Sequence, residues 1–207
     1  MSSSAPPAPR RFDPVAALLS YLLPGLGQVI QGRIAKGIMY FVCLYGLFFY
    51  GLALGEMKNV WLADASDLPP VSSPIGGPLN GVTKALYYRP QFLGQFWIGV
   101  AAWPAVLQYI RTEPPVEPGL RPAPTRILGH FMQAPPELEM NVLLRNGNKL
   151  WDLGWVYTVI AGTLNLLVIY DALAGPVIRD DDEPDKAVGG GSASSEDSTG
   201  KSAALRR

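Results

Sequence analysis

The fold class is decided by residues 37–55, GIMYFVCLYGLFFYGLALG, which hold 15 apolar side chains and four glycines and carry no charge. At about 1.5 Å per residue, a helix of this length crosses the roughly 30 Å hydrocarbon core of a bilayer. Two more uncharged runs follow, residues 90–110 and 153–170, and apolar character resumes at residues 172–174. We therefore predict an all-α membrane protein with three clear transmembrane helices, at residues 37–55, 90–110 and 153–174.

The composition of the whole chain agrees with a membrane protein. Of its 207 residues only 16% are charged, whereas soluble domains carry about a quarter. The 17 basic and 17 acidic side chains balance, so the chain lacks the basic surface that nucleic-acid binding needs. A single cysteine, Cys43, and a single histidine, His130, exclude an intrachain disulfide framework and a multi-cysteine zinc site. We predict no metal, no cofactor and no nucleic-acid partner.

A fourth apolar stretch, residues 15–31, is interrupted by Pro24, Gly25 and Gly27. A helix lying on the membrane surface would normally place lysine or arginine on its polar stripe, and this stretch has none. We therefore predict a kinked N-terminal membrane helix, because proline removes a backbone hydrogen bond. This makes four membrane helices with both tails cytoplasmic, and a surface helix with three spans is the alternative. No small-x-small cleavage site follows, so we expect no cleaved signal peptide.

Polar, proline-containing segments separate these helices. We expect loops at residues 56–89 and 111–152, the second with a short amphipathic surface helix over residues 137–144. Residues 1–14 are rich in serine and proline, and residues 175–207 are rich in acidic residues, serine and glycine. Such segments lack the apolar residues that a folded core needs, so we expect both tails to be disordered.

The second half of the first predicted helix and the turn after it have the sequence PGLGQVIQGRIAKG, residues 24–37. Its proline and glycines allow a bend and close backbone approach, and its two cations can reach lipid phosphates. Residues 15–55 are therefore predicted to form a helical hairpin, with helices over residues 15–31 and 37–55. The residues of this structural motif are Pro24, Gly25, Gly27, Gln28, Gly32, Arg33, Lys36 and Gly37.

These eight positions resemble the P-G-L-G-Q and G-R-x-x-K-G pattern of an uncharacterised family of bacterial multi-pass membrane proteins. The end of the last span, Ile169 to Ala172, is similar to the same family. The hairpin is also distantly similar to the two-transmembrane domain family, but Val29-Ile30-Gln31 replaces its His-Arg-Phe-Tyr signature, so a signalling role attached to that signature does not carry over. The resemblance implies a multi-pass protein of the inner, cytoplasmic membrane without a known activity.

Small residues recur on two of the predicted spans. Close helix approach in lipid depends on such faces, because apolar burial supplies no net drive there. The most polar side chain within a span is Asn165, for which we expect an interhelical hydrogen bond. The expected packing residues are Gly51, Gly55, Gly154, Thr158, Gly162 and Asn165. We expect the lipid bilayer to surround these helices. The small-residue faces would then pack against another helix of the chain, a second copy or another membrane protein.

The three predicted spans carry no ionisable group at depth. Such groups mark proton pumps, coupled transporters and proton relays. We therefore predict no catalytic residue and a non-enzymatic scaffold or interaction protein. The alternative is a transporter subunit or membrane enzyme that uses polar groups at the membrane surface, namely Gln28, Arg33, Glu137, Glu139 and Asp171.

Overall fold

The computed structural model describes residues 12–62, 80–113, 120–145 and 149–175. These residues form helices, connections and one isolated bridge between Thr125 and Gly129, so the all-α prediction is confirmed for the described part of the chain. Contacts divide the chain into two units, residues 1–176 and 177–207, and every described residue lies in the first. Nearly all of the two predicted tails falls outside the described residues.

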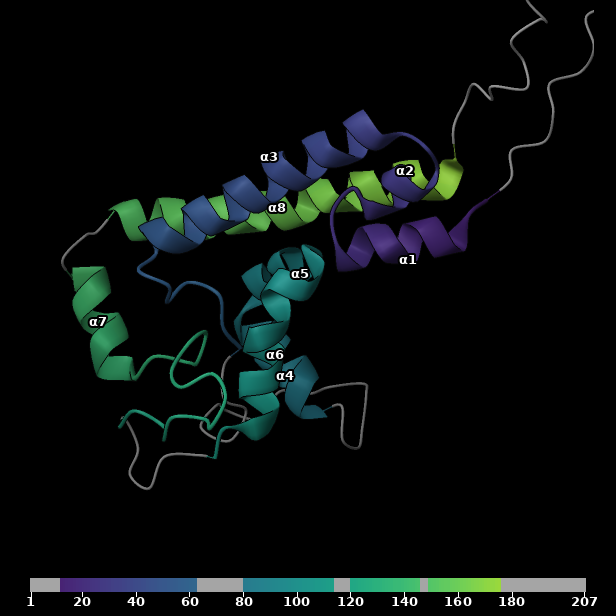
Figure 1. The fold of residues 1–207 in the computed structure, drawn as a ribbon. Coiled ribbons are helices and arrows are strands. Elements are labelled where there is room, and N and C mark those ends of the chain that lie inside the picture. The colour runs from purple at the N-terminus through teal and green to yellow at the C-terminus, as the bar shows by residue number, and fades with distance from the viewer. Residues whose placement is uncertain (1–11, 63–79, 114–119, 146–148, 176–207) are drawn as a thin grey trace, which may run out of the picture. The chain divides into compact units, whose positions relative to one another are not determined.

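Two long helices, α3 (Ile34–Leu54) and α8 (Lys149–Ala174), pack against each other along their lengths (Figure 1). They run antiparallel, because the start of α3 lies beside the end of α8, where Lys36 pairs with Asp171. In the described part of the chain, these two helices are long and apolar enough to cross a membrane, judged by length and composition. Each begins a few residues before the uncharged run that predicts it.

The predicted transmembrane helix at residues 90–110 is wrong. The chain instead forms three short pieces: α5 (Pro90–Phe96), the 3-10 helix η2 (Gly99–Ala102) and α6 (Trp103–Arg111). The break falls at Gly99, whose φ of +83° cannot continue a right-handed helix. A Cβ at this position would also lie 1.8 Å from the carbonyl oxygen of Tyr21. With rises of about 10 and 14 Å, neither α5 nor α6 spans a bilayer alone.

The single kinked helix predicted over residues 15–31 is also corrected, because the stretch forms two short helices, α1 (Pro14–Leu22) and α2 (Leu26–Ile30). Leu23 has an extended backbone with ψ of 117°, which is typical of a residue before proline. Gly25 follows with φ of +86° and is the N-cap of α2. The helix α1 rises about 14 Å, which is too short to cross a bilayer.

Both ends of this α1–α2 pair lie together near the end of α8 (Figure 1). The backbone N–H of Asp13 donates to the carbonyl of Leu173 at 3.0 Å. Gln31 Nε2 donates to the carbonyl of Ala172 at 2.7 Å. Between them, Ser20 lies beside Asn165, about two turns back along α8. The pair therefore runs along α8, reverses at residues 23–25 and returns to the same end of that helix.

The remaining helices are α4 (Asn80–Tyr88), which leads into α5, and α7 (Glu137–Arg145), which lies where a short surface helix is predicted.

One hydrophobic core joins both long helices to the broken segment, residues 90–111. Its buried members are Leu44, Phe48, Leu52, Val60, Leu62, Ala85, Phe92, Ile98, Ala102, Ala105, Met132, Ala161 and Val168. Parts of both predicted loops therefore belong to the core.

Candidate functional site at the hairpin and its junction with α8

A cluster of polar side chains joins the hairpin turn to the last turns of α8. The carboxylate of Asp171 pairs with Arg33 at 2.8 Å and with Lys36 at 2.7 Å. Gln28 Nε2 donates to the same carboxylate at 3.2 Å and to the carbonyl of Val168 at 2.8 Å. Three residues of the predicted hairpin motif thus contact one acidic residue that is more than 130 positions away in the sequence.

The amide of Gln28 is fully buried and bonded at both ends. Its Oε1 accepts from the hydroxyl of Ser20 at 3.0 Å, and that hydroxyl oxygen accepts from the backbone N–H of Gly27 at 3.1 Å. A buried polar network in which each member has a partner holds one geometry and leaves no group free for a ligand. Gln28 therefore orients the hairpin against α8.

The hairpin glycines lie at close backbone contacts. A Cβ on Gly25 would lie 2.1 Å from the carbonyl oxygen of Gly37, and one on Gly27 would lie 2.0 Å from that of Ala16. Pro24, between the two short helices, is buried, and Gly32 lies in the exposed turn before α3. The eight motif positions are thus brought together around one compact turn.

Asn165, near the middle of α8, lies where the two broken segments meet. Its Nδ2 donates to the carbonyl of Ser20 at 3.2 Å and to the carbonyl of Trp97 at 2.8 Å. The Ser20 carbonyl lacks its usual helical partner because Pro24 has no N–H. Trp97 is the C-cap of α5, where carbonyls also lack intrahelical partners. One fully buried amide therefore satisfies two carbonyls that the helix breaks leave free.

The predicted small-residue positions on α3 and α8 lie at contacts within the chain. A Cβ on Gly154 would lie 2.6 Å from the carbonyl oxygen of Gly51, across the interface of α3 and α8. A Cβ on Gly162 would lie 2.0 Å from the carbonyl oxygen of Gly94 in α5. These faces are filled by other helices of the same chain.

A second group of buried polar side chains was not singled out by the sequence. Gln95 Nε2 donates to the hydroxyl of Thr158 at 2.8 Å and to the carbonyl of Asn59 at 3.1 Å. The Asn59 side chain packs on Gly55, and Arg89 also reaches the Asn59 carbonyl. Amide side chains carry no charge, so the distribution of charge along the chain does not reveal them. The glutamines within residues 90–110 are the sequence signal that points to this group.

The acidic residues of the alternative function occupy a different cluster. Glu139 of α7 pairs with Lys58 at 2.8 Å and also with Arg121, while Glu137 is exposed. The hydrogen bond from Lys58 is the largest cause that lowers the pKa of Glu139, and the same bond raises the pKa of Lys58. Because the folded pKa of Glu139 is lowered, its stabilising contribution is present at neutral pH and is lost as the pH falls through that pKa.

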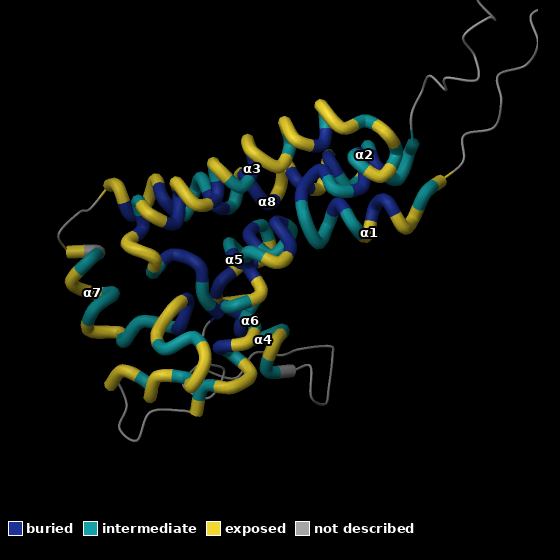
Figure 2. The backbone as a smooth tube through the Cα atoms, viewed as in Figure 1, coloured by how far each residue is buried: buried dark blue, intermediate teal, exposed yellow. Residues whose placement is uncertain are grey.

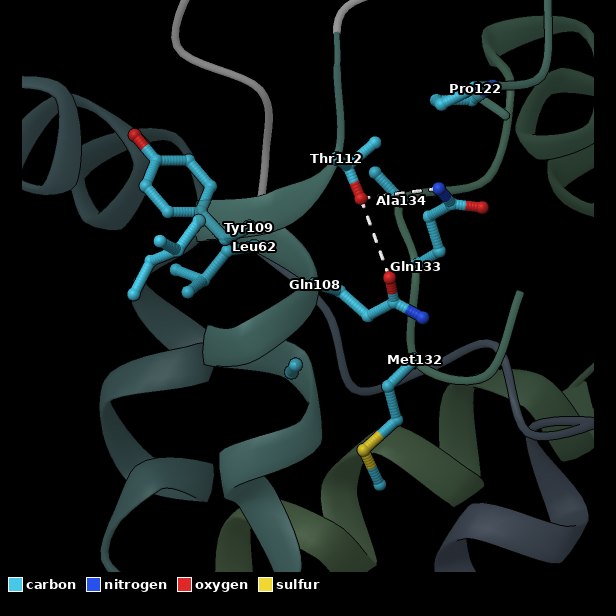
Figure 3. Close-up of a pocket in the computed structure, with 10 residues that line it drawn as sticks. Leu62, Gln108, Tyr109, Thr112, Pro122, Met132, Gln133 and Ala134 are labelled. Atoms are coloured by element: carbon cyan, nitrogen blue, oxygen red, sulfur yellow. Dashed lines mark hydrogen bonds between the residues drawn. The ribbon is translucent and has the colours of Figure 1, made fainter. Parts of the chain in front are cut away.

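A cavity of about 330 Å³ lies between α6 and the second loop (Figure 3). The amides that line it bond to the chain itself. Gln108 Nε2 donates to the carbonyls of Gly129 and Phe131, and Gln133 Nε2 donates to the hydroxyl of Thr112 at 3.2 Å. Its described lining residues include no carboxylate, histidine, cysteine or lysine, so they do not form a nucleophile–base pair.

Residues 15–184 of the chain match the sequence model of one protein family, a family of unknown function (DUF6677). The chain belongs to this family. No curated protein and no solved structure matches the chain. The match includes the hairpin, Asn165 and Asp171, but membership supplies no activity. The similarity to the two-transmembrane domain family remains a resemblance of the hairpin motif.

Replacing Asp171 by asparagine is expected to lower the free energy of unfolding by about 1 kcal/mol, since its ion pairs are only partly shielded from water. Lys36→Met should have a smaller effect, and the double variant should lose less than the sum. Denaturant unfolding in detergent measures this double-mutant cycle. Asp152→Asn, an exposed aspartate in the first turn of α8, is the control. Fully additive losses would contradict the ion pair.

Proposed function

We propose that the protein is a non-enzymatic, multi-pass interaction protein of the cytoplasmic membrane, in which α3 and α8 cross the bilayer. The observation that carries this proposal is the apolar outer surface of these two helices, along which large side chains are exposed. Figure 2 marks exposed residues along both helices. Such extended apolar patches are typical of membrane or protein interfaces. They are formed by Ile34, Ile38, Met39, Phe41, Val42, Phe49 and Tyr50 on α3, and by Leu153, Ile160, Leu164, Leu166, Leu167 and Tyr170 on α8.

The α1–α2 pair is compatible with membrane insertion as a re-entrant segment, which enters and leaves the membrane on the same side. Irregular backbone at membrane depth is tolerated where the protein itself pairs the exposed polar groups. Asn165 does so for the carbonyls of Ser20 and Trp97. The proposal therefore needs two spans and a re-entrant α1–α2 pair in place of four membrane helices.

Both tails lie on the same side in this proposal, because Asp13 is bonded to Leu173. Basic residues are more frequent near that end of the spans, and cytoplasmic segments usually carry the excess. Near it in sequence lie Arg10, Arg11, Arg33, Lys36 and Arg179, and near the other end lie Lys58, Arg145 and Lys149. This difference favours cytoplasmic tails.

A non-enzymatic role is supported by the contacts of the polar side chains that a transporter subunit or membrane enzyme would use. Gln28, Arg33 and Asp171 bind one another, and Glu139 is held by two cations. Because the small-residue faces are filled internally, a partner or second copy would bind the apolar outer face of α3 or α8. Purification in mild detergent tests this interaction. A monomer without any co-purifying protein would count against it.

The sole cysteine offers a test of membrane insertion. Cys43 is exposed and lies nine residues into α3, about 14 Å from its start. In intact membranes we expect almost no reaction with a membrane-impermeant maleimide, because the reagent does not reach a thiol that faces the hydrocarbon core. Reaction should become complete after the protein is unfolded in detergent. Mass spectrometry of the protein measures the modified fraction.

Two cysteines introduced in a Cys43→Ser background serve as controls and report the topology. Phe12→Cys and Leu120→Cys replace exposed side chains on opposite sides of the proposed spans. Maleimide added outside intact cells should label Leu120→Cys and leave Phe12→Cys unlabelled. Labelling of Cys43 as fast as that of Leu120→Cys would overturn the assignment of α3 as a span.

A further inference from the structure

The second group of buried polar side chains, around Asn59, contains an arginine for which the described residues supply no counter-charge. Arg89 is only 8% exposed, and no carboxylate of the described residues lies within ion-pair distance of it. Its Nη2 makes one long hydrogen bond, at 3.5 Å, to the carbonyl of Asn59. Its Nη1 is buried and has no hydrogen-bond partner. A buried charge normally has a partner, because an unpaired one is costly to remove from water.

A second unpaired donor lies against the same guanidinium. The centre of the Arg89 guanidinium lies 3.7 Å from the ring centroid of Trp61, and Trp61 Nε1 is buried without a hydrogen-bond partner. Burial also lowers the pKa of Arg89 to about 10, which is the direction expected when no anion stabilises the charge. Two N–H donors and one positive charge therefore share a small buried site.

The same hydrogen-bonded group also contains acceptors without partners. The side-chain oxygens of Asn59 and Gln95 are buried and unbonded, and both residues belong to the same hydrogen-bonded group as Arg89. An anion that accepts from Arg89 and Trp61 and carries hydroxyl groups would complement all four atoms. Arginine pairs with phosphate particularly well, through parallel hydrogen bonds.

We propose that Arg89 and Trp61 form a binding site for a phosphate group, carried by a hydroxylated phospholipid headgroup or free in solution. The lipid source is favoured by position, since Asn59 Nδ2 donates to the carbonyl of Gly51, one turn from the end of α3. That part of the proposal rests on the proposed membrane insertion, whereas the anion site does not. The guanidinium is covered in this structure, so the phosphate enters through a local movement of the residues that cover it.

The test compares three probes on the full-length protein in detergent: short-chain phosphatidylglycerol, inorganic phosphate and the diacylglycerol that lacks the phosphate. Native mass spectrometry measures lipid binding, and calorimetry measures phosphate binding. We expect phosphatidylglycerol to bind and diacylglycerol not to bind. Trp61→Phe keeps the ring under the guanidinium but removes one donor, and should raise the Kd about tenfold. Arg89→Lys should raise it at least as much.

Arg111→Lys, at the exposed end of α6, is the matched control and should leave the Kd unchanged. Circular dichroism confirms that each variant is folded before binding is compared. Inorganic phosphate that binds as tightly, with the same dependence on Arg89 and Trp61, supports the site and identifies free phosphate as the ligand. It would do so even if the Cys43 labelling contradicted membrane insertion. Absence of binding, or equal binding by the wild type and both variants, overturns the site.

Discussion

Gly162→Leu is expected to destabilise the protein by about 3 kcal/mol, and to reduce the yield of folded protein sharply. A Cβ at Gly162 would already lie 2.0 Å from the carbonyl oxygen of Gly94 and 3.2 Å from that of Gln95. Backbone cannot yield as a flexible side chain can, so α5 must move away from α8. Thermal unfolding of the detergent-purified protein measures the loss, and Gly162→Ala should give an intermediate value.

Leu166→Ala is the control for this prediction. Leu166 lies one turn further along α8 and is 37% exposed, so truncation should cost less than about 1 kcal/mol. If the two substitutions lowered thermal stability equally, the face of α8 that carries Gly162 would not be a helix interface.

Asn165→Leu is expected to cost about 2–4 kcal/mol, because it leaves one buried and one partly buried carbonyl without a donor while keeping a similar side-chain volume. These carbonyls belong to Ser20 and Trp97, which lie next to the breaks in the two segments. Since Pro24 cannot donate to the Ser20 carbonyl, no backbone group replaces the lost hydrogen bond. The free energy of unfolding and the protease resistance of residues 14–31 measure the effect.

Thr163→Val is the matched control on the same helix. The Thr163 side chain is exposed, and its hydroxyl bonds only to carbonyls of its own helix, those of Val159 and Ile160. Its replacement should change stability by less than about 0.5 kcal/mol. An Asn165→Leu variant as stable as Thr163→Val would show that Asn165 does not hold the two broken segments together.

Gly162 and Asn165 stabilise the same junction, where α8 meets the two broken segments, in different ways. Gly162 allows α5 to approach α8 closely, and Asn165 supplies the polar contacts that the approach makes available. Loss of either should release the broken segments while α3 and α8 remain helical. Far-ultraviolet circular dichroism should therefore change much less than thermal stability in both variants.

The sequence by itself determined the helical class and the two long helices. α3 and α8 begin within four residues of their uncharged runs, because a long apolar run without charge forms a helix that needs no particular neighbour. Their small residues could likewise be read as packing positions from spacing alone. Which neighbour each would meet could not be read, since Gly94 and Gly162 are 68 positions apart.

Only the tertiary structure decided how the other two apolar stretches fold. Residues 90–110 lack charge, as a span does, but the absence of charge does not fix the backbone angle φ. Gly99 takes a left-handed conformation against the carbonyl of Tyr21. Residues 15–31 reverse direction instead of merely bending, because α8 supplies hydrogen-bond partners on both sides of the break. Asn165 binds the carbonyl of Ser20 before the break, and Asp171 binds the side chains of Gln28 and Arg33 after it. These contacts join residues 68 to 145 positions apart, a distance over which local propensity and periodicity carry no information.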